Sequence, residues 1–66
     1  MNTKHIHRVE VEGEWPDDGL VTAHYANGAI EDEDMSEAAN WKEAVEILED
    51  HAEDMGTRLE YLKAMH

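Results

Sequence analysis

Five oxygen-bearing side chains between residues 32 and 43 are spaced like the ligands of a calcium-binding loop. The ligand positions 1, 3, 5, 9 and 12 of the EF-hand pattern are filled by Asp32, Asp34, Ser36, Asn40 and Glu43. Position 6 of that pattern must be glycine for a sharp turn, and this chain has Glu37 there. The segment before Asp32 also has the pattern of a strand, whereas an EF-hand loop follows a helix. We therefore expect no calcium site.

The histidines offer a second set of possible metal ligands. His5 and His7 share one face of a predicted strand, and His24 falls on a neighbouring predicted strand, so three imidazoles could in principle meet at a metal ion. The chain has no cysteine, which excludes thiolate ligands and disulfides. Because carboxylates are abundant acceptors for imidazole N–H groups, the sequence favours ordinary surface histidines. It predicts no metal site and no cofactor.

Catalytic chemistry has little support in the sequence. Ser36 is the only serine and lies at a predicted helix start, and no glycine-rich phosphate loop is present. Acid–base catalysis needs two carboxyl groups in different environments within a pocket, which so short a chain can hardly enclose. The sequence therefore predicts a protein that is not an enzyme.

The first half of the chain has the pattern of strands joined by turns. Residues 5–12 alternate with a period of two, as in a strand, and the segment 13–19, which contains the only proline, is predicted to be a loop. Residues 20–26 are apolar and partly β-branched, and Asn27-Gly28 is typical of the type I′ turn of a hairpin. Pairing of Ala26 with Ala29 would place Ala23 opposite Asp32. The core face would then carry Val21, Ala23, Tyr25 and Ile30.

A helix is predicted from about residue 35 to 55. Asp34 is the expected N-cap, with Glu37 in the capping-box position, and Gly56 is the expected C-cap glycine. Apolar residues recur at spacings of three and four and predict a face that lies on the sheet: Ala38, Trp41, Val45, Leu48, Ala52 and Met55. Residues 57–64 fit either a short second helix or a strand, and the strand is favoured.

These elements predict a single α+β domain over residues 1–66. Its small antiparallel sheet, of three or four strands, packs on one face against a single long amphipathic helix. No apolar segment is long enough for a membrane span or a signal peptide, so a cytoplasmic protein is expected.

The solvent face of the predicted helix carries a row of carboxylates, which we call the acidic stripe. At about 100° per residue, these side chains gather opposite the apolar face: Glu43, Glu46, Asp50, Glu53 and Asp54. The helix rises about 16 Å from residue 43 to 54, so the five charges are on average about 4 Å apart along the axis, of the same order as the roughly 3.4 Å between charges along one DNA strand. Only Lys42 interrupts the row, whereas an ordinary solvated helix face intersperses lysines.

Two further features extend this candidate binding surface. Ile47 projects beside the stripe, where it is either an apolar contact for a partner or a residue covered by a neighbouring loop. A second acidic segment precedes the helix and consists of Glu31, Asp32, Glu33 and Asp34. Whether this segment joins the stripe in one surface is left open by the sequence.

The charge balance indicates an electrostatic function. The chain has 17 Asp or Glu residues against five Lys or Arg residues, a formal net charge of −12. Its apolar content of 41%, with two Trp and two Tyr, favours a folded domain over an acidic disordered tail. A folded polyanion is repelled by nucleic acid and by anionic membranes and is attracted to basic surfaces, above all those that bind DNA. The expected partner is therefore a basic DNA-binding protein.

Several segments resemble a known class of proteins. These are His7-Arg8-Val9-Glu10-Val11, Gly13-Glu14-Trp15-Pro16, Val21–Gly28 and Glu31–Glu37, and they are similar to small phage-encoded anti-CRISPR proteins that act on type I-C systems. The resemblance implies a monomeric inhibitor in the cytoplasm of an infected bacterium. It also implies a partner, the DNA-binding surface of the Cascade complex on the large subunit that reads the PAM. No shared catalytic motif accompanies the resemblance.

Two other classes of protein fit part of the pattern. The order of strand, hairpin, helix and strand also resembles the partial RNase H-like domain of HicB-type antitoxins, although the glycine-aspartate lead into the helix is missing. A halophile protein would likewise combine many carboxylates with few lysines and would inhibit nothing. Such a protein needs molar salt to fold, whereas a DNA mimic folds at ordinary ionic strength.

Overall fold

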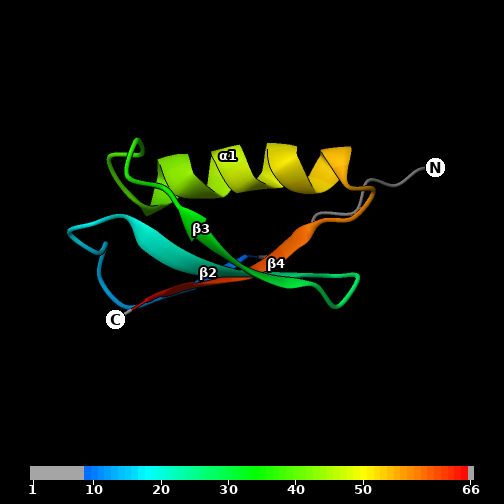
Figure 1. Cartoon of the computed structure of the whole chain (residues 1–66), viewed down its shortest axis with the longest axis horizontal. Coiled ribbons are helices and arrows are strands. Elements are labelled where there is room, and N and C mark those ends of the chain that lie inside the picture. The colour runs from blue at the N-terminus through cyan, green and yellow to red at the C-terminus, as the bar shows by residue number, and fades with distance from the viewer. Residues whose placement is uncertain (1–8, 66) are drawn as a thin grey trace.

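Within the described part of the chain, four strands form one sheet, and one helix lies across one of its faces. The computed structural model describes residues 9–65. Along the chain the elements are β1 (Glu10–Glu12), β2 (Leu20–Tyr25), β3 (Ile30–Asp34), α1 (Trp41–Asp54) and β4 (Leu59–Ala64). The described residues leave the second face of the sheet uncovered (Figure 1). The predicted α+β fold class is thereby confirmed.

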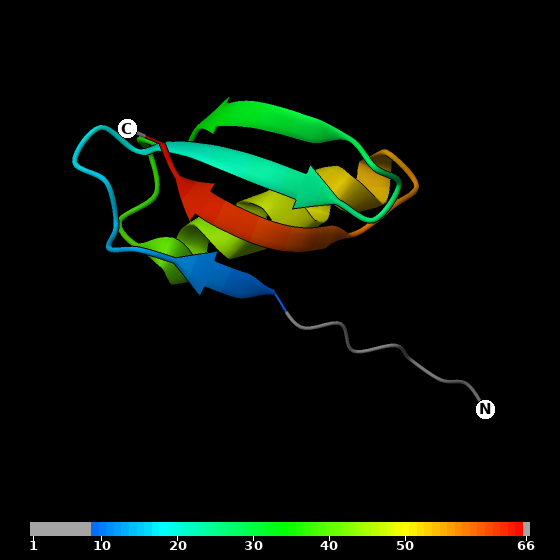
Figure 2. The ribbon, with the colours of Figure 1, turned by 90° about the horizontal axis from the view of Figure 1, so that it is seen from below.

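The sheet is mixed and not wholly antiparallel as predicted, and β4 lies in its interior. The strand order is β1-β4-β2-β3, and β4 pairs antiparallel with β2 and parallel with β1 (Figure 2). Parallel strands need a long crossover connection, and here β2, β3 and α1 all lie between β1 and β4 in the chain. The strand favoured for residues 57–64 is confirmed by β4. Residues 5–8 of the predicted first strand lie outside the described residues.

The turn between β2 and β3 is not the predicted type I′ turn. The N–H of Gly28 donates to the carbonyl oxygen of Tyr25, and the N–H of Tyr25 donates to that of Ala29, both at 2.9 Å. Three residues therefore form the loop instead of two. A type I′ turn needs positive φ at both central residues, but Asn27 does not have it and only Gly28 does, at +93°. This is the hydrogen bonding of a three-residue hairpin loop that ends in a left-handed glycine.

The extra loop residue shifts the register of the hairpin by one position. Ala23 pairs with Glu31 instead of the predicted Asp32. Because successive residues of a strand face opposite sides, this shift exchanges the two faces of β3. Ile30 is 61% exposed, so its prediction as a core residue is wrong. The residues of β2 predicted for the core face are buried: Val21, Ala23 and Tyr25.

The helix begins at Trp41, later than the predicted residue 35. Its N-cap is Asn40, whose Oδ1 accepts the N–H of Glu43 at 3.1 Å, so the prediction of Asp34 as N-cap is wrong. The Oε1 of Glu43 in turn accepts the N–H of Ala39 at 3.0 Å. Asp34 instead closes a separate turn by accepting the N–H of Ser36 at 3.0 Å. The helix start does have a capping pattern, but Asn40 and Glu43 form it instead of the predicted Asp34 and Glu37.

The end of the helix and its apolar face agree with the sequence. The N–H of Gly56 donates to the carbonyl oxygen of Glu53, and that of Thr57 donates to Ala52, both at 3.0 Å, the hydrogen bonds of a Schellman motif. Leu48 and Ala52 are fully buried against the sheet. The other predicted apolar positions are buried or partly buried around this core: Ala38, Trp41, Val45 and Met55.

The loop of residues 13–19 closes the core beside the start of α1. The indole N–H of Trp41 donates to the carbonyl oxygen of Gly13 at 3.0 Å, and the ring of Trp15 packs edge-on against that of Trp41 with centroids 5.2 Å apart. The N–H of Met35 donates to the carbonyl oxygen of Gly19 at 2.7 Å. These contacts hold the segment before Asn40 outside the helix.

Candidate functional site

The acidic stripe lies on the face of α1 that points away from the sheet. The buried residues of α1 are Ala44, Leu48 and Ala52, and the stripe lies on the opposite side of the helix. All five stripe residues are exposed: Glu43, Glu46, Asp50, Glu53 and Asp54. Because the helix is capped at both ends and packed along its inner face, the stripe carboxylates project from a fixed backbone.

Among the described residues, two basic side chains lie beside the stripe. The Nζ of Lys42 is 3.8 Å from the Oε2 of Glu46, and both side chains are largely exposed. Arg58 lines a shallow depression together with Glu46, Asp50 and Glu53, but its guanidinium pairs with Glu60 at 3.7 Å. Exposed ion pairs of this kind contribute little free energy. Because the stripe has five exposed carboxylates and only Lys42 pairs with one of them among the described basic side chains, it keeps a net negative charge that is accessible to a partner.

Ile47 lies beside the stripe and is 42% exposed. No neighbouring loop of the described chain covers it, which was the alternative left open by the sequence. An apolar side chain bordered by charges resembles the centre of a protein interface, where an apolar contact is surrounded by a polar rim. Ile47 can therefore supply a contact that does not depend on charge.

The acidic segment of residues 31–34 does not form one surface with the stripe. Glu31 and Glu33 pair with the buried residues Ala23 and Val21, so they face the helix side of the sheet and are partly buried. Asp32 and Asp34 face the uncovered side. The Oδ1 of Asp32 accepts the hydroxyl of Thr22 at 3.3 Å, and hydrogen bonds from the side chain and backbone of Ser36 lower the pKa of Asp34.

The ten residues predicted to bind a partner thus divide into three groups. The first is the stripe with Ile47, the second is Glu31 with Glu33, and the third is Asp32 with Asp34. The first group is the largest, with six exposed residues on α1, whereas each of the other two groups has two residues of β3.

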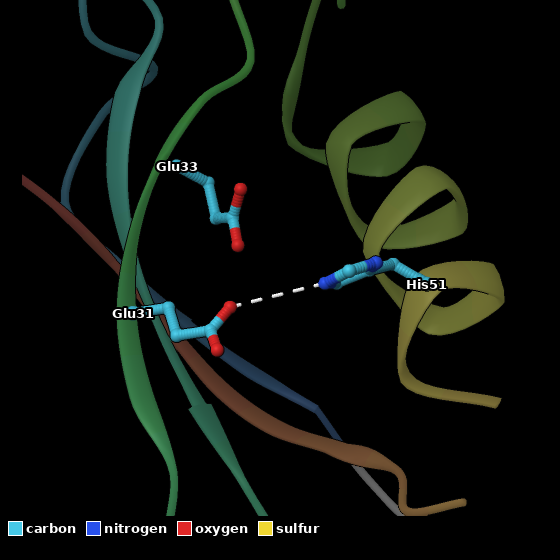
Figure 3. Close-up of side chains that lie close together, drawn as sticks. All are labelled: Glu31, Glu33 and His51. Atoms are coloured by element: carbon cyan, nitrogen blue, oxygen red, sulfur yellow. Dashed lines mark ion pairs between the residues drawn. The ribbon is translucent and has the colours of Figure 1, made fainter. Parts of the chain in front are cut away.

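Glu31 and Glu33 of β3 face His51 of α1 (Figure 3). We call these three side chains the Glu–His cluster. The Nε2 of His51 is 3.8 Å from the Oε1 of Glu31, and one nitrogen or oxygen atom from each of the three side chains lies within 4.8 Å of the others. Burial raises the pKa of Glu33, and a hydrogen bond with the Glu31 carboxyl raises it further, while the charge of His51 acts in the opposite direction.

Tyr25 lies under this cluster, on the neighbouring strand β2. It is 3% exposed, and its hydroxyl has no hydrogen-bond partner among the described residues. Its ring lies edge-on to that of His51, with centroids 6.2 Å apart. Burial raises the pKa of Tyr25 to about 12, and the charges of Glu33 and Glu31 contribute to that rise. The hydroxyl is therefore close enough to the cluster for the carboxylate charges to raise its pKa.

The uncovered face of the sheet has a different character. The hydroxyl of Tyr61 donates to the Oε1 of Glu12, which raises the pKa of Tyr61, and the ring of Tyr61 packs edge-on against His24 at 5.4 Å. His24 belongs to the three-histidine set considered above, whose other members, His5 and His7, lie outside the described residues. This face is on the other side of the sheet from the acidic stripe.

The Glu–His cluster was missed by sequence reasoning because its geometry depends on the hairpin register. With the predicted type I′ turn, Glu31 and Glu33 would face away from the helix. A three-residue loop at Asn27-Gly28 turns them toward it, and His51 lies at the border of the apolar face of α1. The turn residues Asn27-Gly28 and the position of His51 on the helix can both be read from the sequence. The cluster is predicted only when the two are combined.

Comparisons with protein-family models, characterised proteins and solved structures found no match to this chain. Within residues 9–65, no helix is long and apolar enough to cross a membrane.

Proposed function

We propose that the protein is a stoichiometric inhibitor that imitates the phosphate backbone of DNA and occupies a basic nucleic-acid-binding surface of another protein. The observation that carries this proposal is the acidic stripe, five exposed carboxylates in a row on one face of α1. The formal net charge of −12 adds a long-range attraction toward any basic surface. Lys and Arg side chains arranged for phosphates are the natural complement of such a row.

The helix makes the stripe suited to this task because its backbone needs no ordering on binding. Asn40 caps its start, and Gly56 follows its end. Preorganisation reduces the entropy lost on association, which otherwise weakens binding between charged surfaces. The mean axial spacing of about 4 Å between charges along the helix is of the same order as the roughly 3.4 Å between phosphates of one DNA strand, so the carboxylates can meet basic groups placed for phosphates.

The proposed target is the type I-C Cascade complex, specifically the basic surface of its PAM-reading subunit. The similarity of four segments to anti-CRISPR proteins supports this choice. The inhibitor acts as a monomer in the cytoplasm of the infected bacterium, performs no catalysis and does not bind DNA itself, since both molecules are strongly negative. Binding of target DNA by the complex is the step that it blocks.

Neutralising the stripe tests the proposal. The triple variant Glu46→Gln/Asp50→Asn/Glu53→Gln leaves the capping residue Glu43 intact and changes the net charge from −12 to −9 (−12 + 3). The amount of inhibitor needed to halve target-DNA binding by purified Cascade at about 150 mM salt should rise by at least about tenfold. Circular dichroism should show an unchanged fold, because Gln and Asn keep the size of the replaced side chains.

A matched control separates the stripe from overall charge. The variant Glu14→Gln/Asp17→Asn/Glu37→Gln also has a net charge of −9 (−12 + 3), and its three positions are exposed residues outside α1. It should inhibit within about threefold of the parent. Equal losses in both variants would assign the effect to net charge, and full inhibition by the stripe variant would overturn the proposal.

Ile47→Asp tests whether the interface also uses an apolar contact. The substitution adds a negative charge, so pure electrostatics predicts inhibition at least as strong as that of the parent. With Ile47 as a buried contact in the complex, inhibition should weaken by about tenfold. Ile30→Asp is the matched control, because Ile30 is also exposed but lies on β3, away from the stripe.

A further inference from the structure

Three side chains of metal-ligand type converge between the sheet edge and the helix. Glu31 and Glu33 are two residues apart on β3 and point the same way, and His51 reaches toward them from α1 (Figure 3). One donor atom of each lies within 4.8 Å of the others. Two carboxylates and one imidazole are ligands that zinc and related divalent metals accept.

The carboxyls of Glu31 and Glu33 share a hydrogen bond, but the imidazole of His51 is not hydrogen-bonded to Glu31. The 3.8 Å between the Nε2 of His51 and the Oε1 of Glu31 is longer than the 2.7 to 3.2 Å of a hydrogen bond. Among the described residues, the ion pairs of Lys and Arg involve Glu46 and Glu60, so no such pair satisfies Glu31 or Glu33. A cation between the three side chains would satisfy all of them.

The hydroxyl of Tyr25 is a second and independent sign of a missing ligand. It is fully buried, and it has no hydrogen-bond partner among the described residues. Buried hydroxyls nearly always have a partner, because an unsatisfied one loses its hydrogen bonds to water on folding. The Tyr25 ring lies edge-on to that of His51, and the charges of Glu33 and Glu31 act on its hydroxyl, which therefore lies near the cluster. A water molecule bound to a metal ion there would be its natural partner.

We propose that Glu31, Glu33 and His51 bind one divalent transition-metal ion, with Zn²⁺ as the representative species. Three protein ligands leave a fourth position of a tetrahedral zinc ion for water, to which the Tyr25 hydroxyl is hydrogen-bonded. Ligands about 2.0 to 2.1 Å from zinc lie roughly 3.3 Å from one another, so rotation of long glutamate side chains suffices to close the site. Calcium and magnesium are poorer candidates, because they prefer more oxygen ligands and no imidazole.

The ion would join two elements that share no backbone hydrogen bonds, the edge strand β3 and the helix α1. It would thus brace the sheet edge against the helix that carries the acidic stripe. It would also offset part of the carboxylate charge at that edge. The sequence predicts no metal site, since its candidate ligands were the EF-hand-like oxygens and the histidines at 5, 7 and 24, and the cluster uses a different set.

Calorimetric titration of the untagged, full-length chain with Zn²⁺ tests the site. One ion should bind per chain, and saturating Zn²⁺ should raise the melting temperature by at least about 5 °C. Glu33→Gln and His51→Gln should each weaken zinc binding by at least about tenfold and abolish the rise in melting temperature. Tyr25→Phe should weaken binding by about tenfold, because it removes the group that orients the bound water.

Matched controls separate the cluster from general attraction of cations. Asp32→Asn removes one charge from the same strand but on the uncovered face, and His24→Gln removes a histidine from that face. The double variant His5→Gln/His7→Gln removes the histidines near the N-terminus. All three should bind Zn²⁺ like the parent. The proposal is overturned if the parent binds no zinc, if His51→Gln or Glu33→Gln binds like the parent, or if binding is lost in one of the three controls instead.

Discussion

Tyr25 combines a buried ring that stabilises the core with a buried hydroxyl that has no partner among the described residues and lies near two carboxylates. Its ring completes the core beside Leu59, with which it pairs across β2 and β4, while its hydroxyl is buried with no partner among the described residues. Leaving a buried hydroxyl unsatisfied costs about 1 to 3 kcal/mol. Ionisation is also opposed by burial and by Glu33 and Glu31, which together raise the pKa of Tyr25 to about 12. The hydroxyl group, unlike the ring, thus lowers the unfolding free energy of the metal-free protein.

Tyr25→Phe should therefore stabilise the metal-free protein, by about 1 kcal/mol at pH 7 in the presence of a chelator. Alkaline pH adds a second effect. An acid whose folded-state pKa is raised stabilises the fold only while protonated, so stability is retained below the unfolded pKa of about 10 and lost as pH rises toward 12. The advantage of Tyr25→Phe over the parent should be roughly 1.4 kcal/mol larger at pH 11 than at pH 8. Urea unfolding at both pH values measures it.

Tyr61→Phe is the natural control for that measurement. The Tyr61 hydroxyl donates to Glu12 and links β4 to β1, so its removal should lower stability at pH 7. The two Tyr→Phe substitutions are thus expected to have opposite signs at neutral pH. A destabilising Tyr25→Phe would show that the hydroxyl has a partner in solution.

At the scale of elements, the β2–β3 hairpin shows what can be predicted from sequence. Alternation with a period of two correctly identified the buried residues of β2, because that pattern depends on one strand only. The register of β3 depends on the turn, and Asn27-Gly28 is compatible with both a two-residue and a three-residue loop. One residue of difference placed Ile30 on the wrong face and concealed the Glu–His cluster.

The start of α1 was mispredicted for a related reason. Asp34 with Glu37 and Asn40 with Glu43 are both capping patterns, and local propensity does not distinguish them. The choice is made by contacts distant in sequence, since Met35 is hydrogen-bonded to Gly19 and Trp41 to Gly13. The acidic stripe was nevertheless predictable, because it depends only on helical periodicity within residues 43–54. The parallel pairing of β1 with β4 has no local signal at all.

Alanine substitutions at Gly19 and Gly28 can distinguish the free-energy cost of backbone strain from the cost of a steric clash. Gly19 and Gly28 both have positive φ, at +72° and +93°. A Cβ at Gly28 meets nothing within 4 Å, whereas one at Gly19 would lie 2.4 Å from the Cα of Ser36. Gly28→Ala should therefore cost about 1 to 2 kcal/mol of unfolding free energy from strain alone. Gly19→Ala should cost at least about 2 kcal/mol more, because the 35–36 backbone must move.

Thermal or urea unfolding of the two alanine variants measures that difference. Equal costs would mean that the contact between Gly19 and Ser36 does not restrain the chain before α1. In that case, the late start of the helix would have to come from Asn40 and from the contact of Trp41 with Gly13.

At the scale of the whole molecule, the fold distributes its charge over different faces. The stripe points away from the sheet, the Glu–His cluster lies between sheet and helix, and Asp32 with Asp34 faces the uncovered side. Separation on opposite faces limits repulsion between like charges, which otherwise destabilises a compact state. The total charge was readable from composition, but the division into three groups required the register of β3 and the position of α1.

The protein should fold without high salt. Each end of the helix is capped, and a continuous core lies between α1 and the sheet. The unfolding free energy should therefore be positive at about 150 mM NaCl. It should rise only moderately at about 2 M, because salt screens the repulsion between carboxylates. Urea titration at the two salt concentrations provides the measurement, since urea itself carries no charge. A chain that is unfolded at the lower concentration would instead fit a halophile protein.

Competition with DNA should shift in favour of the inhibitor as salt rises. Duplex DNA carries one charge per roughly 1.7 Å of axis and releases condensed counterions on binding, so its affinity falls steeply with salt. The stripe has about half that charge density, and Ile47 offers a contact that salt does not screen. Between about 50 and 200 mM salt, the Kd of Cascade for target DNA should therefore rise by a larger factor than its Kd for the inhibitor.

The Kd of the stripe variant for Cascade should depend less steeply on salt than that of the control variant of equal net charge. If inhibitor affinity falls as steeply as DNA affinity and equally in both variants, the stripe does not form the contact, and the interface must be sought elsewhere on the molecule.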